Sequence, residues 1–295
     1  MLYKQNLLLG ACLILCSELF FASMGATVKA VTLDLPSEMA VFMRSLFGLL
    51  VLLPLVWRSG IATLRTSIMH LHLLRAAAGV SAMYCFFFAL ARLPLAQGMV
   101  LKMTAPLFMP LIAWYWMSEP LYRRVLLAIG FGFVGVVLVL NPHSEFNQVA
   151  LIGLLGGIFA SLAKVTVRRL GHSEPSVRVV FYFSVLSLLI SILPALWCWQ
   201  TPTAEQWGLL VLIGLLGTLG QLLLTRGYAV AEAASVSPFT YFSVIFGSLY
   251  GYMFWNEGLS LQFVVGALII ALAGMLTLHA GRNRTSTLLN QTAEP

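Results

Sequence analysis

Charged residues are scarce in this sequence. Asp, Glu, Lys and Arg together occupy 9% of its 295 positions, and hydrophobic residues occupy 60%. In a soluble globular domain, charged residues supply about 25% of the positions. Too little polar surface remains to cover a water-soluble globule, so the composition excludes a soluble enzyme or binding module and predicts an integral membrane protein.

The sequence also lacks the motifs of several functional classes. It has no Gly-rich loop ending in Gly-Lys-Ser/Thr, so we do not expect ATP hydrolysis. The sequence also has no cluster of basic and aromatic residues of the kind that would indicate nucleic-acid binding. The four cysteines lie in apolar stretches without His or acidic partners, and His70 and His72 are two residues apart, which points them to different faces of a helix. We therefore expect neither a metal nor another cofactor.

Ten apolar stretches remain when the chain is divided at its charged and Pro/Gly-rich breaks. Each is close to the roughly 20 residues that a helix needs to cross a bilayer, so the sequence predicts an all-α fold. The predicted spans are 6–29, 36–57, 69–91, 95–117, 122–140, 148–168, 176–197, 206–227, 233–254 and 259–279. No small-residue cleavage site follows the first stretch, so we expect it to be a retained span and not a signal peptide.

The sequence resembles itself at an offset of 138 residues. The matching positions include Phe21-Ala22-Ser23 with Phe159-Ala160-Ser161, Gly79 with Gly217, and Glu119 with Glu257. Five spans in each half is an odd number, so the second half must cross the membrane in the opposite sense. We predict two inverted five-helix repeats, 1–143 and 144–281, followed by a mobile cytoplasmic tail, 282–295. Such duplications are typical of membrane transporters.

The basic residues indicate how the spans are oriented. With the N-terminus inside, the outer loops hold only Lys29 and Arg92. The cytoplasmic segments then hold Lys4, Arg58, Arg65, Arg123, Arg124, Arg168, Arg169, Arg178, Arg282 and Arg284. Cytoplasmic loops carry such an excess of Lys and Arg. This bias explains the formal net charge of +7, and it predicts a bacterial inner-membrane protein with both termini in the cytoplasm.

Two junctions between spans carry the same pattern, Ser118-Glu119-Pro120 and Asn256-Glu257-Gly258. We expect Ser118 and Asn256 to be N-caps and the glutamates to lie in the first turn of the next helix, where the helix dipole favours an acid. This is a structural role for the glutamates. Gating or substrate contact is the alternative.

These junctions carry a family resemblance. Two copies of an aromatic helix with Pro and Ala, ending in Glu and followed by a Gly-spaced helix (130–135 and 266–274), resemble the EamA-like branch of the drug/metabolite transporter superfamily over about residues 8–280. The segments 38–54, which contains Arg44, and 74–79 are also similar to members proposed to carry S-adenosylmethionine or riboflavin. The resemblance implies a fold of ten helices and a transport function.

From the resemblance and the residues we expect a secondary active transporter working by alternating access. Its solute would be a small amphipathic metabolite, such as an amino acid, a nucleoside-like compound or a cofactor precursor, and its energy would come from a proton gradient or from exchange. The oligomeric state stays open. The alternative is a membrane-embedded enzyme acting on lipids or prenyl groups, which would need clustered acids or histidines. A non-transporting sensor or assembly subunit is a third hypothesis.

Charged residues inside predicted spans are costly, by roughly 3 kcal/mol each, so each needs a partner or a function. Glu18 is either a proton-titrating or cation-binding carboxylate in a central cavity, or the ion-pair partner of Arg44 or Lys102. Arg44 would tie several acceptors together. Lys102 would face the cavity, or it would snorkel toward the headgroups or form an ion pair. For Lys164 we expect the side chain to reach the cytoplasmic headgroups.

The fourth predicted span is expected to be a broken helix. Pro106 and Pro110 follow Lys102, and proline interrupts the hydrogen bonds of a helix. Transporters have such broken helices near their binding sites. Thr240, beside Pro238, is the repeat counterpart of Lys102. The predicted cavity or coupling residues are Glu18, Arg44, Tyr84, Lys102, Gln221, Thr240 and Tyr241.

Overall fold

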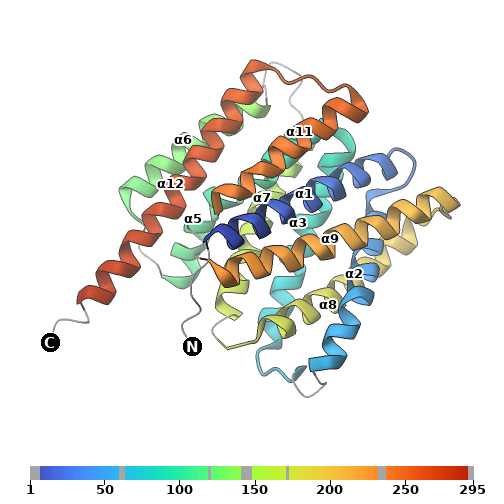
Figure 1. Cartoon of the computed structure of the whole chain (residues 1–295), viewed down its shortest axis with the longest axis horizontal. Coiled ribbons are helices and arrows are strands. Elements are labelled where there is room, and N and C mark those ends of the chain that lie inside the picture. Colours follow the sequence, from blue (N-terminus) through green and yellow to red (C-terminus); the bar gives the residue numbers. More distant parts are fainter. Residues whose placement is uncertain are drawn as a thin grey trace.

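The computed structural model describes residues 7–59, 64–118, 121–140, 148–170, 173–231 and 237–291, and these residues form helices and turns with no strand among them (Figure 1). The helices of the first half are α1 (Leu7–Val31), α2 (Ser37–Ser59), α3 (Met69–Arg92), α4 (Leu95–Lys102), α5 (Ala105–Met117) and α6 (Arg123–Leu140). Those of the second half are α7 (Gln148–Leu170), α8 (Ser176–Trp197), α9 (Ala204–Val230), the 3-10 helix η2 (Ser237–Tyr241), α11 (Phe242–Trp255) and α12 (Leu261–Gln291).

Eight segments of the described chain are long and apolar enough to cross a membrane, and they correspond to the first eight predicted spans. The ninth predicted span, 233–254, corresponds to η2 and α11, and its residues 233–236 lie outside the described residues. The tenth is α12, with an apolar stretch Leu261–Leu276. Large apolar side chains such as Leu127 and Leu193 are exposed, which suits contact with lipid. The fold is therefore that of an all-α membrane protein.

Helix α12 continues to Gln291, beyond the predicted end of the last span at 279. We predicted a mobile tail from residue 282, but the backbone up to Gln291 extends the last helix. The predicted repeat boundary at 143/144 falls within 141–147, outside the described residues, and stays a prediction.

The packing of the helices repeats the internal duplication. The 138-residue offset relates α1, α2, α3, α5 and α6 to α7, α8, α9, α11 and α12. Exchanging the two halves turns the packing contact between α1 and α9 into that between α7 and α3, and the contact α1–α11 into α7–α5. The contacts α2–α8 and α6–α12 are each exchanged with themselves. Figure 1 shows α6 and α12 on one side of the molecule and α2 and α8 on the other, with α1, α3, α7 and α9 between them. This arrangement follows from two inverted repeats related by a pseudo-twofold axis.

The fourth span is broken, as predicted. Helix α4 ends at Lys102, and α5 begins at Ala105 after two residues that make i to i−3 hydrogen bonds. Pro106 lies in the first turn of α5, whereas Pro110 lies inside α5 without ending it. The equivalent position in the second half is the change from η2 to α11 at Phe242. Each half thus has an irregular segment at matching positions.

The predicted caps at Ser118 and Asn256 are wrong. Both residues follow the end of a helix, α5 and α11 respectively, with left-handed φ values of 54° and 52°. They are C-caps, a position where a polar residue tolerates the left-handed conformation. Helix α12 begins only at Leu261, so Glu257 is not in its first turn. Glu119 lies outside the described residues.

Candidate functional site

Glu18 and Lys102 lie together in the interior of the bundle. Glu18 is on the buried face of α1 with a side chain that is 3% exposed, and its Oε2 is 3.9 Å from Nζ of Lys102. Lys164 of α7 and Ser243 of α11 face the same carboxylate. Of the two partners weighed from the sequence, the structure thus places Lys102, and not Arg44, beside Glu18.

Lys102 occupies the last position of α4, where the negative end of the helix dipole favours a cation. Its ammonium lies 4.4 Å from the ring centroid of Phe21 and 5.8 Å from that of Phe86. The side chain is 28% exposed. Lys164, which we expected to extend toward the headgroups, is exposed but close enough for its charge to act on both Glu18 and Lys102. We call Glu18, Lys102, Lys164 and Ser243 the charged cluster.

Thr240 adjoins this cluster, and Tyr241 points away from it. The Ser243 hydroxyl donates a hydrogen bond to the Thr240 carbonyl at 2.9 Å. The Tyr241 hydroxyl lies against Gly274 of α12, where a Cβ atom would overlap it. Both residues belong to η2, so one short segment contacts the cluster and α12 together.

Arg44 lies in a separate place between α2, α3, α8 and α9. Its guanidinium carbon is 5.9 Å from the ring centroid of Phe183, and that of Arg75 is 4.1 Å from the same centroid. Sequence reasoning did not select Arg75, although it lies well inside α3 and so carried the same signal as Arg44. Tyr84 and Gln221 are half-buried on α3 and α9, and Glu38 and Cys198 lie near Tyr84. The predicted residues thus occupy more than one site.

At one end of the bundle, the two halves are joined by an ion pair that the sequence did not predict. Lys29 Nζ lies 2.5 Å from Glu257 Oε1 and donates a second hydrogen bond, 2.7 Å long, to the Leu93 carbonyl. Glu257 Oε2 accepts a hydrogen bond of 2.7 Å from the Leu95 N–H, the first residue of α4. Glu257 therefore stabilises a helix N-terminus, as expected, but that of α4 and not of α12. We call these four residues the Glu257 network.

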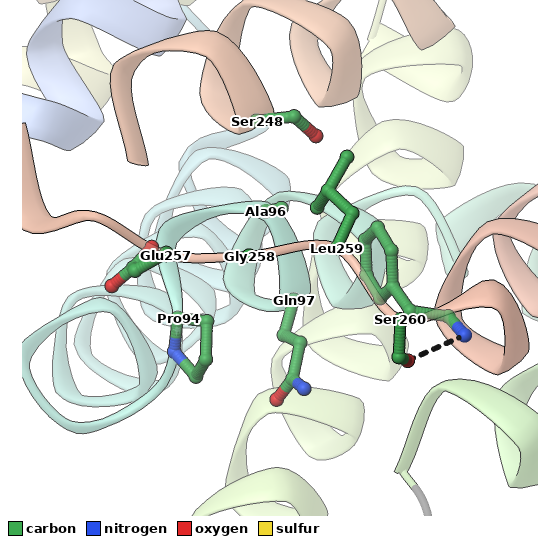
Figure 2. A pocket seen from close by; sticks show the side chains of 9 residues that line it. Pro94, Ala96, Gln97, Ser248, Glu257, Gly258, Leu259 and Ser260 are labelled. Atoms are coloured by element: carbon green, nitrogen blue, oxygen red, sulfur yellow. Dashed lines mark hydrogen bonds between the residues drawn. The ribbon is translucent and has the colours of Figure 1, made fainter. Parts of the chain in front are cut away.

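A small pocket adjoins the Glu257 network (Figure 2). It lies between the start of α4, α11 and the loop before α12, with a volume of about 170 Å³, and it presents polar groups from Gln97, Ser248, Glu257 and Ser260. Ligand pockets for drug-sized molecules measure about 300–1,000 Å³. The pocket is too small to enclose a metabolite in this conformation.

At the opposite end of the bundle, a second network surrounds Glu174, between α7 and α8. Thr66 donates a hydrogen bond of 2.7 Å and Arg178 one of 2.5 Å to the Glu174 carboxylate, with His72 Nε2 at 4.0 Å. Burial raises the pKa of Glu174, but these hydrogen bonds and the nearby positive charges outweigh it and hold the pKa below 4.5. We call these four residues the Glu174 network. Both networks join a residue of the first half to one of the second.

Comparison with known proteins agrees with this architecture. The sequence profile of the EamA-like transporter family matches residues 8–141 and 147–278. A solved crystal structure aligns with a TM-score of 0.64 at 16% identity, covering 97% of this chain and 99% of the other, which supports the fold alone.

Three curated relatives are similar along most of their length. The pseudopaline exporter CntI of Pseudomonas aeruginosa is 31% identical, covering 90% of this chain and 94% of the relative. The riboflavin transporter of Vibrio cholerae is 30% identical, with 92% and 93% covered. The S-adenosylmethionine uptake transporter of Rickettsia bellii is 28% identical, with 83% and 84% covered.

Proposed function

The chain belongs to the EamA-like transporter family, and we propose that it is a secondary active transporter that moves a small amphipathic metabolite across the bacterial inner membrane by alternating access. Amino acids, nucleoside-like compounds such as S-adenosylmethionine, and cofactor precursors are the solutes that we infer. The relatives are named as transporters of three different small molecules, which supports a transport function and a non-enzymatic role.

The arrangement of the two end networks supports alternating access. Lys29 and Glu257 come from different halves, and so do Thr66 and Glu174. A movement of one half against the other must therefore break one network to open that end of the bundle. The charge bias of the loops supports an orientation with both termini in the cytoplasm, which puts the Glu257 network on the outer side and the Glu174 network on the inner side.

The buried Glu18–Lys102 pair is the observation that carries the proposal of proton coupling. Protonation of Glu18 would remove its attraction to Lys102 at the break between α4 and α5. At 4 Å, two unit charges attract by about 1 kcal/mol in water and about 4 kcal/mol at an effective dielectric constant of 20. A change of about 1.4 kcal/mol alters a population ratio tenfold, so the loss of this attraction is large enough to shift the balance between two conformations.

The graded exposure of the cluster supports our proposal that a proton reaches Glu18. Lys164 is exposed, Lys102 is 28% exposed and Glu18 is 3% exposed, so accessibility falls step by step toward the carboxylate. A buried titratable group that is reached through polar side chains is the arrangement that transporters use for proton relay.

Uptake into proteoliposomes tests this proposal. A thermal-shift screen of the purified protein against amino acids, nucleosides, S-adenosylmethionine and riboflavin would first select a solute, because a ligand stabilises the folded state. We expect an imposed proton gradient to drive uptake of that solute in the wild type and not in Glu18→Gln. Glu205→Gln, which changes an exposed carboxylate of α9, is the matched control.

The outcomes separate the parts of the proposal. Unchanged pH dependence in Glu18→Gln would exclude Glu18 from coupling and favour exchange. Lys102→Ala is expected to weaken solute binding more than it lowers the melting temperature. A folded wild-type protein that moved none of these solutes, either with a gradient or in exchange, would contradict the proposed solute class.

A further inference from the structure

We propose that Arg44 and Arg75, which lie over the ring of Phe183, bind a carboxylate group of the transported solute. This inference rests on the proposed transport function and adds a chemical class to the solute. We call Arg44, Arg75 and Phe183 the arginine site.

The two guanidinium carbons lie at most about 10 Å apart. Both are centred over the Phe183 ring, at 5.9 Å for Arg44 and 4.1 Å for Arg75, so their carbon atoms are no further apart than the sum of these distances. The three side chains come from α2, α3 and α8, which pack against one another. Two like charges at this separation repel each other, and an anion bound between them would remove that repulsion.

Two of the three donor nitrogens of Arg75 lack partners in the described part of the chain. Its Nε and Nη1 atoms are buried and make no hydrogen bond there, and no ion pair or hydrogen bond joins Arg44 to a described residue. A buried donor that stays unpaired costs about 1–3 kcal/mol, and more when the group is charged. Arginine donors are arranged in a rigid planar fork that matches a carboxylate. The site thus presents donors to an anion that the described residues do not supply.

The charges inside the spans also favour binding of an anion at the arginine site. Well inside the spans, the described residues include four cations, Arg44, Arg75, Lys102 and Lys164, and one carboxylate, Glu18. Lys102 and Lys164 both face Glu18, and no carboxylate of the described residues pairs with the two arginines. Charges at membrane depth are retained where they pair or act on a transported solute. A solute with a carboxylate would complete the charge balance.

Two glycines related by the internal repeat make room for the guanidinium groups. A Cβ atom at Gly79 of α3 would overlap Nη1 of Arg75 and the ring of Phe183. A Cβ atom at Gly217 of α9 would lie 3.2 Å from Nε of Arg44. Both glycines are near the middle of their helices, so the arginine side chains reach toward the centre of the bundle from positions nearer the helix ends.

Stacking on an aromatic ring does not by itself explain the site, as Arg92 of the same helix demonstrates. Its guanidinium carbon lies 3.7 Å from the Phe88 ring centroid, but this residue is at the exposed end of α3, where its remaining donors reach solvent. Arg75 makes the same kind of ring contact with buried donors. Arg92→Gln is therefore a matched control for Arg75→Gln.

Pairs of probes that differ only in the carboxylate test the inference. S-adenosylmethionine is compared with its decarboxylated form, and phenylalanine with phenethylamine, by thermal shift and by uptake of the full-length protein in proteoliposomes. Riboflavin serves as a probe without a carboxylate. We expect the wild type to bind a carboxylate-bearing probe at least tenfold more tightly than its decarboxylated partner.

The variants assign this preference to the arginines. Arg75→Gln and Arg44→Gln are each expected to weaken binding of the carboxylate probe by roughly ten- to a hundredfold and to leave the decarboxylated probe unchanged. Arg92→Gln should bind both as the wild type does. If Arg75→Gln does not fold, Arg75→Lys keeps the charge, removes the planar fork, and should still lose about tenfold in affinity.

Two results would overturn the inference while the transport function stands. One is equal affinity of the wild type for both members of a pair, and the other is wild-type affinity for the carboxylate probe in Arg75→Lys or Arg44→Gln. A folded wild-type protein that neither binds nor moves any probe, riboflavin included, would instead remove the proposed solute class, and the inference with it.

Discussion

Replacing Glu257 by Gln is expected to lower the free energy of unfolding by about 2 kcal/mol. The amide oxygen can still accept the hydrogen bond from the Leu95 N–H, but Lys29 loses its counter-ion. The side chains of Lys29 and Glu257 are 10% and 17% exposed. Breaking a fully buried pair costs about 3–5 kcal/mol and an exposed one about 0–1 kcal/mol, so a largely buried pair lies between these limits.

The melting temperature of the detergent-purified protein measures this cost. One kcal/mol corresponds to about 2–4 °C in domains of 150–250 residues, so Glu257→Gln should melt about 4–8 °C below the wild type. Lys29→Met removes the other partner and should cost a similar amount. Because either change already eliminates the attraction, the double variant should be no less stable than the less stable of the two single variants. Arg92→Gln, at the same end of the bundle, is the control.

A double-mutant cycle distinguishes an ion pair from two independent contributions. We expect a coupling energy of about 2 kcal/mol between positions 29 and 257. Strictly additive losses, or melting temperatures within 1 °C of the wild type for both single variants, would refute the reasoning that the Glu257 network holds the two halves together.

The remaining predictions concern the opposite end and the α6–α12 contact. Since the Glu174 pKa is held below 4.5, this carboxylate stabilises the fold above that pH and loses the effect as the pH falls through its lowered pKa. Glu174→Gln should therefore melt below the wild type at pH 7, with a gap that narrows under acidic titration; a constant gap would contradict this. Gly135→Ala should lower the free energy of unfolding by about 1–3 kcal/mol, because its Cβ would meet the Gly266 carbonyl oxygen at 2.7 Å. The Cβ of Gly130→Ala would meet nothing within 4 Å, so in a melting assay this control should be neutral or stabilising.

The fold could be predicted from the sequence because its determinants are local or periodic. The length of each apolar stretch indicates a span, and the 138-residue offset with five spans per half requires inversion. The break after Lys102 follows from the proline at 106, a property of the backbone at one place. The expected neighbours Glu18 and Lys102 lie together because both are charges that cannot stay unpaired at this depth.

Long-range pairings could not be predicted in the same way. Lys29 and Glu257 are 228 residues apart, and each was assigned to the helix or loop nearest to it in sequence. The caps at Ser118 and Asn256 failed for a related reason. A polar residue before an acid fits an N-cap of the next helix, but the same residue also fits the left-handed end of the preceding one, and the connecting loop decides between them. Arg75 was not selected because its distinguishing features are its contact with Phe183 and its buried donors, which the sequence does not reveal.

The inverted repeat gives the two ends of the bundle related backbones but different side chains. Under the 138-residue offset the counterpart of Lys29 is Val167, and that of Glu174 is Pro36, so neither network is repeated at the other end. The proposed inward-open and outward-open states therefore share their helix packing and differ in the polar contacts that each must break. The Glu174 network loses its carboxylate charge as the pH falls through the lowered pKa of Glu174, so we expect this network to weaken in acid. We therefore propose that the side chains of the two networks, and not the helix scaffold, set the preference between the two states.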